Sequence, residues 1–201
     1  MKRNFIFILV ILILISQLSF SESRKLDSLT LLINEESSDS ILFDTYISIG
    51  KVYSDSNLLQ SRFYYMQSLN YTNTLQNKIP VGKTYMELGN ILTKLGEYAK
   101  ALAYFNMSAN LFDSISVDTF DSWIDLKVGN VLWFQEEYDQ ALYYYQQSYK
   151  KALFVNDLLV ANYALGNISI CYQEMGRYEE ALQILNTKLQ KSIEYCLDDQ
   201  G

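Results

Sequence analysis

The sequence predicts an all-α protein built as a solenoid of antiparallel helix pairs. Its 201 residues include one proline and eight glycines, which are too few to bound a series of short strands. Apolar residues recur at steps of three and four, the spacing of one face of a helix. The whole pattern then recurs at a constant interval, from Tyr98 to Tyr138 to Tyr178, as expected for stacked helical hairpins.

Residues 1–21 are predicted to be an export signal. Lys2 and Arg3 precede an apolar run from Phe5 to Ile15, and mostly polar residues follow as far as Ser21. This order is typical of a secretory signal peptide, with cleavage after Ser21 and a periplasmic or extracellular destination. The alternative is an uncleaved membrane anchor, although the run is much shorter than the ~20 apolar residues that span a bilayer.

The segment after the signal is expected to be a short amphipathic helix. Leu26, Leu29, Leu32 and Ile33 share one helical face, and that face would cover the first repeat as a cap. The predicted organisation is therefore a signal peptide at 1–21, a capping helix and linker at 22–39, a repeat array at 40–196 and a tail at 197–201.

A degenerate first copy of the repeat is expected at about residues 40–73. Tyr46, Ile49 and Tyr53 would form the inner face of its first helix. Tyr65 would occupy the corresponding position of its second helix, between two serines. No glycine marks the turn between them, so this copy departs from the pattern of the others.

Three clear copies follow, and their second helices share one register. The residues spaced 40 apart are Tyr98, Tyr138 and Tyr178, then Ala101, Ala141 and Ala181, and then Leu102, Leu142 and Leu182. Gly96-Glu97, Glu136-Glu137 and Gly176-Arg177 are the predicted turns within the hairpins. Glycine at such a turn allows the left-handed backbone that ends a helix.

The first helices of the three copies carry small residues. Because the alanines of the second helices lack bulk, we expect the facing helix to approach until Gly89, Gly129 or Ser169 packs against them. Gly166 comes earlier in the last copy than Gly129 does in the middle one, so Ser169 is the residue in register. In the middle copy, Asp125 stands where an apolar residue is expected.

These features resemble the tetratricopeptide repeat family. Gly89 matches its small residue on the first helix, Gly96 and Tyr98 its turn, and Ala101 and Phe105 its second helix. The spacing of 40 exceeds the family's usual ~34 residues, as in its long-repeat branch. The resemblance implies a right-handed solenoid, here with three clear repeats and one degenerate repeat, whose concave face binds peptides or helices of other proteins.

Candidate binding residues lie where the first helices would line that concave face. They are Asn90, Trp123, Lys127, Asn130, Trp133, Phe134, Tyr163, Asn167 and Ile170. Aromatic rings supply contact area, and amides pair with a peptide backbone. The alternative is that Trp133 and Phe134 merely pack between repeats. Some family members clamp a terminal carboxylate at this surface, but the positive charge here is too small for that.

The composition argues against several other functions. The chain has no histidine, which excludes histidine-based catalysis and histidine-ligated metals. Its 23 acidic residues outnumber the 16 basic ones, so a broad basic surface for nucleic acid is not expected. We therefore expect neither an enzyme nor a cofactor, and we expect the partner to be a protein or peptide. Contact with a membrane is expected only if the N-terminal segment is an uncleaved anchor.

Two functions fit this sequence. The first is an exported interaction scaffold that binds a peptide or helix on its concave face. The second is the N-terminal input region of a membrane-bound signalling protein, either a histidine kinase or a transcriptional regulator, of which this chain would be a truncated part. The second follows from the similarity to the N-terminal repeat regions of bacterial tetratricopeptide signalling proteins.

Overall fold

The computed structural model describes residues 24–33 and 37–198, and within them it is all-α. The described chain forms two compact units, of which the first ends at Lys78 and the second begins at Ile79. The predicted signal segment at 1–21 lies outside the described residues. Within the described part, none of the helices is both long enough and apolar enough to cross a bilayer.

The first unit contains the degenerate hairpin. The Tyr65 ring lies against Gly50, where an added Cβ would come within 2.9 Å of it. The Ser61 hydroxyl donates a hydrogen bond to the Gly50 carbonyl at 2.8 Å, and Ile49 is fully buried beside it. A helical stretch at 24–30 precedes the hairpin, and Leu32 just beyond it is exposed. The elements of the hairpin are α2 (Asp39–Val52), α3 (Leu58–Ser68) and the 3₁₀ turn η1 (Leu69–Tyr71).

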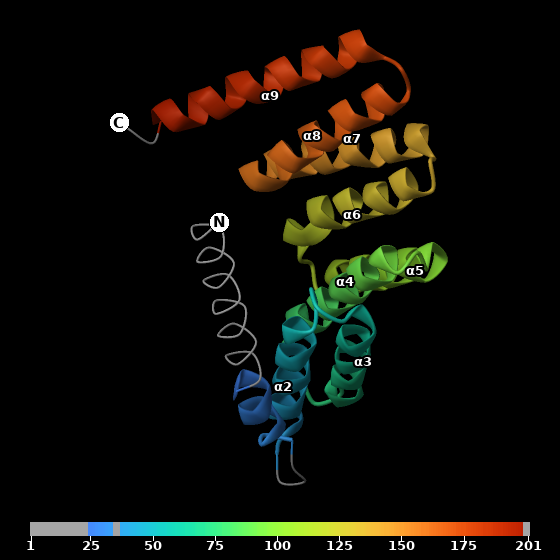
Figure 1. The fold of residues 1–201 in the computed structure, drawn as a ribbon. Coiled ribbons are helices and arrows are strands. Elements are labelled where there is room, and N and C mark those ends of the chain that lie inside the picture. The colour runs from blue at the N-terminus through green and yellow to red at the C-terminus, as the bar shows by residue number, and fades with distance from the viewer. Residues whose placement is uncertain (1–23, 34–36, 199–201) are drawn as a thin grey trace, which may run out of the picture. The chain divides into compact units, whose positions relative to one another are not determined.

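The second unit contains the three clear copies as consecutive hairpins (Figure 1). Each first helix packs against its own second helix, and α6 also contacts both α4 and α8. The first helices of neighbouring repeats therefore lie beside one another. The elements are α4 (Ile79–Lys94), α5 (Tyr98–Ser114), the 3₁₀ turn η2 (Asp118–Phe120), α6 (Asp121–Phe134), α7 (Tyr138–Phe154), α8 (Leu158–Glu174) and α9 (Tyr178–Asp198).

The turns within the hairpins lie where the sequence predicted them. Gly96 and Gly176 have φ angles of 76° and 72°, the left-handed region that glycine enters without steric cost. In the middle hairpin Glu136 adopts φ 64°. The shared geometry of the turn therefore holds even where a side chain makes it less favourable.

The packing between paired helices differs in one respect from the prediction. The space beside Gly89 is filled by the ring of Phe105, and that beside Gly129 by the ring of Tyr145. An added Cβ at either glycine would come within 2.6 Å of a ring carbon. The groups nearest to the glycines are therefore the rings that follow Ala101 and Ala141 by one helical turn, and not the alanine methyl groups.

A buried hydrogen bond recurs in two hairpins of the second unit. The Ser108 hydroxyl donates to the Gly82 carbonyl at 2.9 Å, and the Ser148 hydroxyl donates to the Ser122 carbonyl at 2.7 Å. The two donors occupy equivalent positions of successive repeats, and so do the two acceptors. The hydroxyl fixes the axial position of each second helix against its first helix, since a buried hydroxyl without a partner would be costly.

The last helix leaves its apolar stripe open to solvent. Leu142 on α7 is 9% exposed beneath the next repeat, whereas the equivalent Leu182 on α9 is 60% exposed. Tyr178 and Leu189 on the same stripe are also exposed. Among the described elements α9 packs mainly against α8, so the face that would receive another helix is uncovered.

Candidate functional site

A pocket of about 490 Å³ opens in the second unit between α6, α7 and α8. Its volume lies within the ~300–1,000 Å³ usual for ligand sites. Most of its lining comes from first helices, because α6 and α8 are neighbours. The lining residues are Trp123, Leu126, Lys127, Asn130, Trp133, Phe134, Tyr145, Tyr163, Asn167 and Ile170.

The structure brings eight of the nine candidate residues to this one pocket. The ninth, Asn90, lies on α4 outside the lining and donates a hydrogen bond to Glu87 on its own helix at 3.2 Å. Two lining residues, Leu126 and Tyr145, were not among the candidates. Tyr145 occupies the position equivalent to Phe105 and is buried in the core of its hairpin, but its hydroxyl also reaches the pocket wall.

Helical spacing explains why these side chains converge. Trp123, Lys127 and Asn130 follow at steps of four and three on α6, which places them on one face at about 100° per residue. Tyr163 and Asn167 on α8 repeat the step of four. The two faces meet, and the rings of Trp123 and Tyr163 lie 6.2 Å apart between centroids.

Trp123 is held in place by a residue that the sequence analysis did not single out. Its indole N–H donates to the Oδ2 of Asp157 at 3.1 Å. The Oδ1 of Asp157 accepts a hydrogen bond from the backbone N–H of Val160 at 3.0 Å and so caps the start of α8. One carboxylate therefore ties the orientation of the indole ring to the beginning of the next repeat.

Two asparagines and a tyrosine form a polar network on the pocket wall. The Tyr145 hydroxyl donates to the Oδ1 of Asn130 at 2.9 Å, and the Nδ2 of Asn167 donates to the same oxygen at 3.0 Å. Burial raises the pKa of Tyr145 well above its ordinary value, so the hydroxyl keeps its proton and remains a donor. The network fixes the orientation of the Asn130 amide.

Lys127 is a half-buried lysine in the lining of the pocket. Its Nζ lies 5.7 Å from the centroid of the Trp123 ring. Within the described part of the chain, no carboxylate oxygen lies within 4.0 Å of that nitrogen. Burial lowers the pKa of Lys127; to a smaller extent, Glu87 raises that pKa and Lys94 lowers it further. The charge is therefore less well compensated than that of a solvated lysine.

Trp133 and Phe134 combine the two roles considered from the sequence. Both line the pocket. Phe134 also stacks on Tyr98 of the preceding repeat at 6.3 Å between centroids, yet it is 51% exposed. Trp133 packs against the core around α7 and α8. Packing between repeats therefore orients these rings and still leaves part of their surface facing the pocket.

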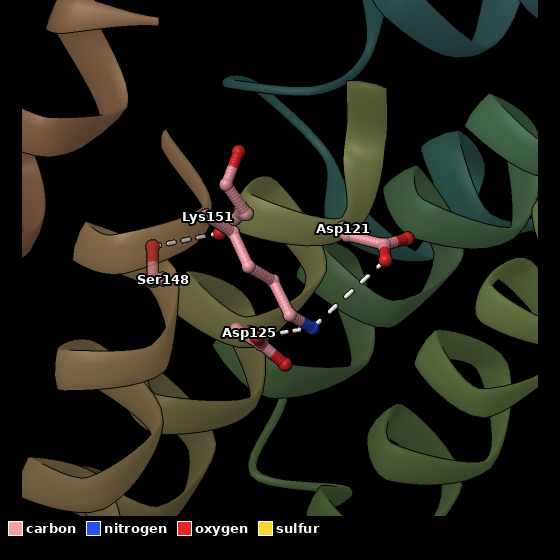
Figure 2. Close-up of polar contacts among 5 residues, drawn as sticks. Asp121, Asp125, Ser148 and Lys151 are labelled. Carbon is pink, nitrogen blue, oxygen red and sulfur yellow. Dashed lines mark hydrogen bonds and ion pairs between the residues drawn. The ribbon is translucent and has the colours of Figure 1, made fainter. Parts of the chain in front are cut away.

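A charged cluster lies on the opposite side of α6 (Figure 2). Lys151 of α7 extends toward Asp125, with Nζ 2.8 Å from its carboxylate, and toward Asp121, at 3.9 Å. Asp125, the polar residue that interrupts the apolar pattern of α6, is thus paired with a lysine of the second helix of the same hairpin. Among the described residues no group of three or more acidic or cysteine side chains is arranged to hold a metal. The ion pairs of Lys151 link α7 to α6.

Comparison with known proteins identifies the repeats. A family model described as tetratricopeptide repeat matches residues 80–153 and again residues 118–190. Together these matches cover the three clear copies and more than half of the chain. No curated protein matches the sequence.

Several solved structures share the fold. BtubC from P. vanneervenii aligns with a TM-score of 0.69 and 13% identity over 86% of this chain and 71% of its own. A Rap protein complexed with Competence and Sporulation Factor aligns at 0.69 and 12% identity, over 83% of this chain and 46% of its own. A signal transduction ATPase with a tetratricopeptide repeat sensor, from Pyrococcus horikoshii, aligns at 0.69 and 15% identity, over 77% and 24%. This chain spans less than half the length of the latter two.

Proposed function

Because the chain belongs to the tetratricopeptide repeat family, whose arrays are protein-interaction scaffolds, we propose that the pocket between α6, α7 and α8 holds a peptide or helix of another protein. The fold alone does not place the binding surface. The placement rests on the pocket, which gathers four partly accessible aromatic rings and two amides on neighbouring first helices. We propose no catalytic role for it.

The chemistry of the lining supports a peptide ligand. Rings such as Trp123 and Phe134 are held by contacts within the protein, so little side-chain entropy is lost when they contact a ligand. Fixed amides such as Asn130 can pair with a backbone that has left water. The structure of the Rap protein with Competence and Sporulation Factor is a precedent in the same fold for a bound factor.

Two tryptophan variants test the assignment of the site. We expect Trp123→Ala or Trp133→Ala to weaken binding to peptides on a random array by about 2 kcal/mol or more if either is an energetic hot spot. Tyr143→Ala is the matched control, because this α7 ring is 57% exposed but lies outside the pocket lining. Circular dichroism verifies that each variant folds. Unchanged peptide binding in both tryptophan variants would refute the site.

We further propose that the chain is exported by the segment 1–21. The support is the order of its features, with Lys2 and Arg3 followed by the apolar run. Fractionation of cells followed by N-terminal sequencing tests this proposal. A mature protein that begins at Glu22 is the expected result. An intact N-terminus in the membrane fraction would favour the anchor, and an intact N-terminus in the cytosol would refute both.

The alternative proposal is that the array is the input region of a membrane-bound signalling protein, either a histidine kinase or a transcriptional regulator. The observation that favours it is the similarity to the repeat sensor of the signal transduction ATPase. The reading frame that encodes the native protein distinguishes the two functions. An apolar span of about 20 residues and an output domain after Gly201 would support the input region.

A further inference from the structure

Asn130 and Lys127, the amide and the lysine that α6 contributes to the pocket lining, offer hydrogen-bond donors. The Oδ1 of Asn130 already accepts two hydrogen bonds, from Tyr145 and Asn167. Its Nδ2 therefore keeps both N–H groups for a ligand, and neither has a partner among the described residues. An amide fixed in this way can only donate, so a group bound opposite it must be an acceptor.

A second donor lies one helical turn away on the same face of α6. Lys127 lines the pocket, and its ammonium carries three N–H groups with no carboxylate oxygen within 4.0 Å in the described chain. The ammonium of Lys151 on α7, whose side chain is 44% exposed, is by comparison paired with Asp125 and Asp121. A more exposed lysine of the same hairpin is thus paired with carboxylates, whereas the more buried Lys127 has none within 4.0 Å in the described chain.

We propose that the bound segment carries one acidic side chain next to a bulky apolar residue. Its carboxylate would contact Lys127 and Asn130, and the apolar side chain would lie between the rings of Trp123, Trp133 and Phe134. This inference rests on the proposed peptide-binding function and adds the class of peptide. One ammonium matches one carboxylate, and charge-assisted hydrogen bonds are the stronger kind.

The negative net charge of the protein should restrict binding to segments with few acidic residues. The chain has a net charge of −7, so an acidic peptide is repelled over most of its surface and attracted where Lys127 stands. A segment with several acidic residues therefore gains less than a segment with one. A purely apolar segment would leave the ammonium without a partner and cover it from water, which is unfavourable.

A peptide array read with three forms of the full chain tests the proposal. The probes are random peptides that include pairs differing only by Glu or Gln, each with a free or an amidated C-terminus. Wild type should prefer the Glu member of a pair by about tenfold or more, the worth of a hydrogen bond to a charged group. Lys127→Met should lose that preference and retain the apolar one. Lys94→Met removes the same charge outside the pocket and should leave the preference intact.

The outcomes separate this inference from the function on which it rests. If wild type binds apolar peptides without any preference for Glu, the inference is wrong and the peptide-binding function stands. A preference for Glu that persists in Lys127→Met also overturns it. If amidation of the C-terminus abolishes the preference, the carboxylate is a terminal one and the side-chain assignment fails. Should no peptide bind to wild type, both proposals fail.

Discussion

Gly129 offers a direct test of how the paired helices pack. It lies in the interior of α6, and a Cβ added there would be 2.6 Å from a carbon of the Tyr145 ring. Real side chains do not approach so closely, so the ring must move in Gly129→Ala. Tyr145 is 2% exposed and donates to Asn130. Movement of the ring therefore disturbs the core and the pocket wall together.

The expected magnitude follows from two opposing effects. Overpacking a dense core costs about 1–3 kcal/mol, while replacing glycine by alanine inside a helix gains about 1 kcal/mol. We expect Gly129→Ala to be destabilising by about 1 kcal/mol, with a further loss of about 1 kcal/mol if the tyrosine hydrogen bond breaks. Gly166→Ala is the matched control, since only the flexible end of Lys188 is near its Cβ position, at 3.1 Å. It should gain up to about 1 kcal/mol.

Urea unfolding and thermal melts of the full chain measure both variants. The two should differ by about 2 kcal/mol, or about 4–8 °C in melting temperature for a chain of this size. The tyrosine fluorescence of Gly129→Ala should also change, since the ring moves. If Gly129→Ala stabilises the protein as much as Gly166→Ala does, the ring does not fill the space beside the glycine and the packing described above is wrong.

Two further predictions concern the core and the charged cluster. Leu142→Ala should cost about 2–4 kcal/mol of unfolding free energy, whereas Leu182→Ala on the open stripe should change it by less than about 0.5 kcal/mol. Equal losses in urea unfolding would contradict the difference in burial. Burial raises the pKa of Asp125 above 3.8 in the folded chain, so the folded state binds more protons than the unfolded chain just above that pH. The contribution of Asp125 to stability should therefore fall as pH rises through this window. Because Asp125→Asn lacks this falling contribution, its stability should fall less, or rise more, with pH across this range than that of wild type, and identical slopes would exclude the effect.

The repeated hairpins could be predicted because their determinants are local in sequence. Register, turn position and the inner face of each helix follow from residues such as Tyr98 and Tyr138, which recur at one spacing. The same periodicity predicted most of the residues that line the pocket. Trp123 and Lys127, for example, lie on the face of α6 that is directed toward the neighbouring first helix. The local pattern thus determined which side chains share a surface.

Contacts that join distant positions could not be predicted in this way. Nothing in the local pattern indicates that Lys151 reaches Asp125, or that Asp157 accepts from the indole of Trp123. Each depends on the length and rotamer of a side chain after the helices have packed. The glycine contacts differed from expectation for the same reason, because a ring one turn beyond Ala141 extends farther than the methyl group.

The uncovered stripe of α9 has a consequence for how the second unit opens. In a linear stack, an interior helix must break contacts on two sides before it unfolds, whereas α9 mainly breaks those with α8. Backbone amides of α9 should therefore exchange with deuterium soonest, and protection should increase toward α6. In the 201-residue chain, the hairpin that contributes most of the pocket wall would then be the last to fray, so a bound ligand would be retained while α9 opens and closes.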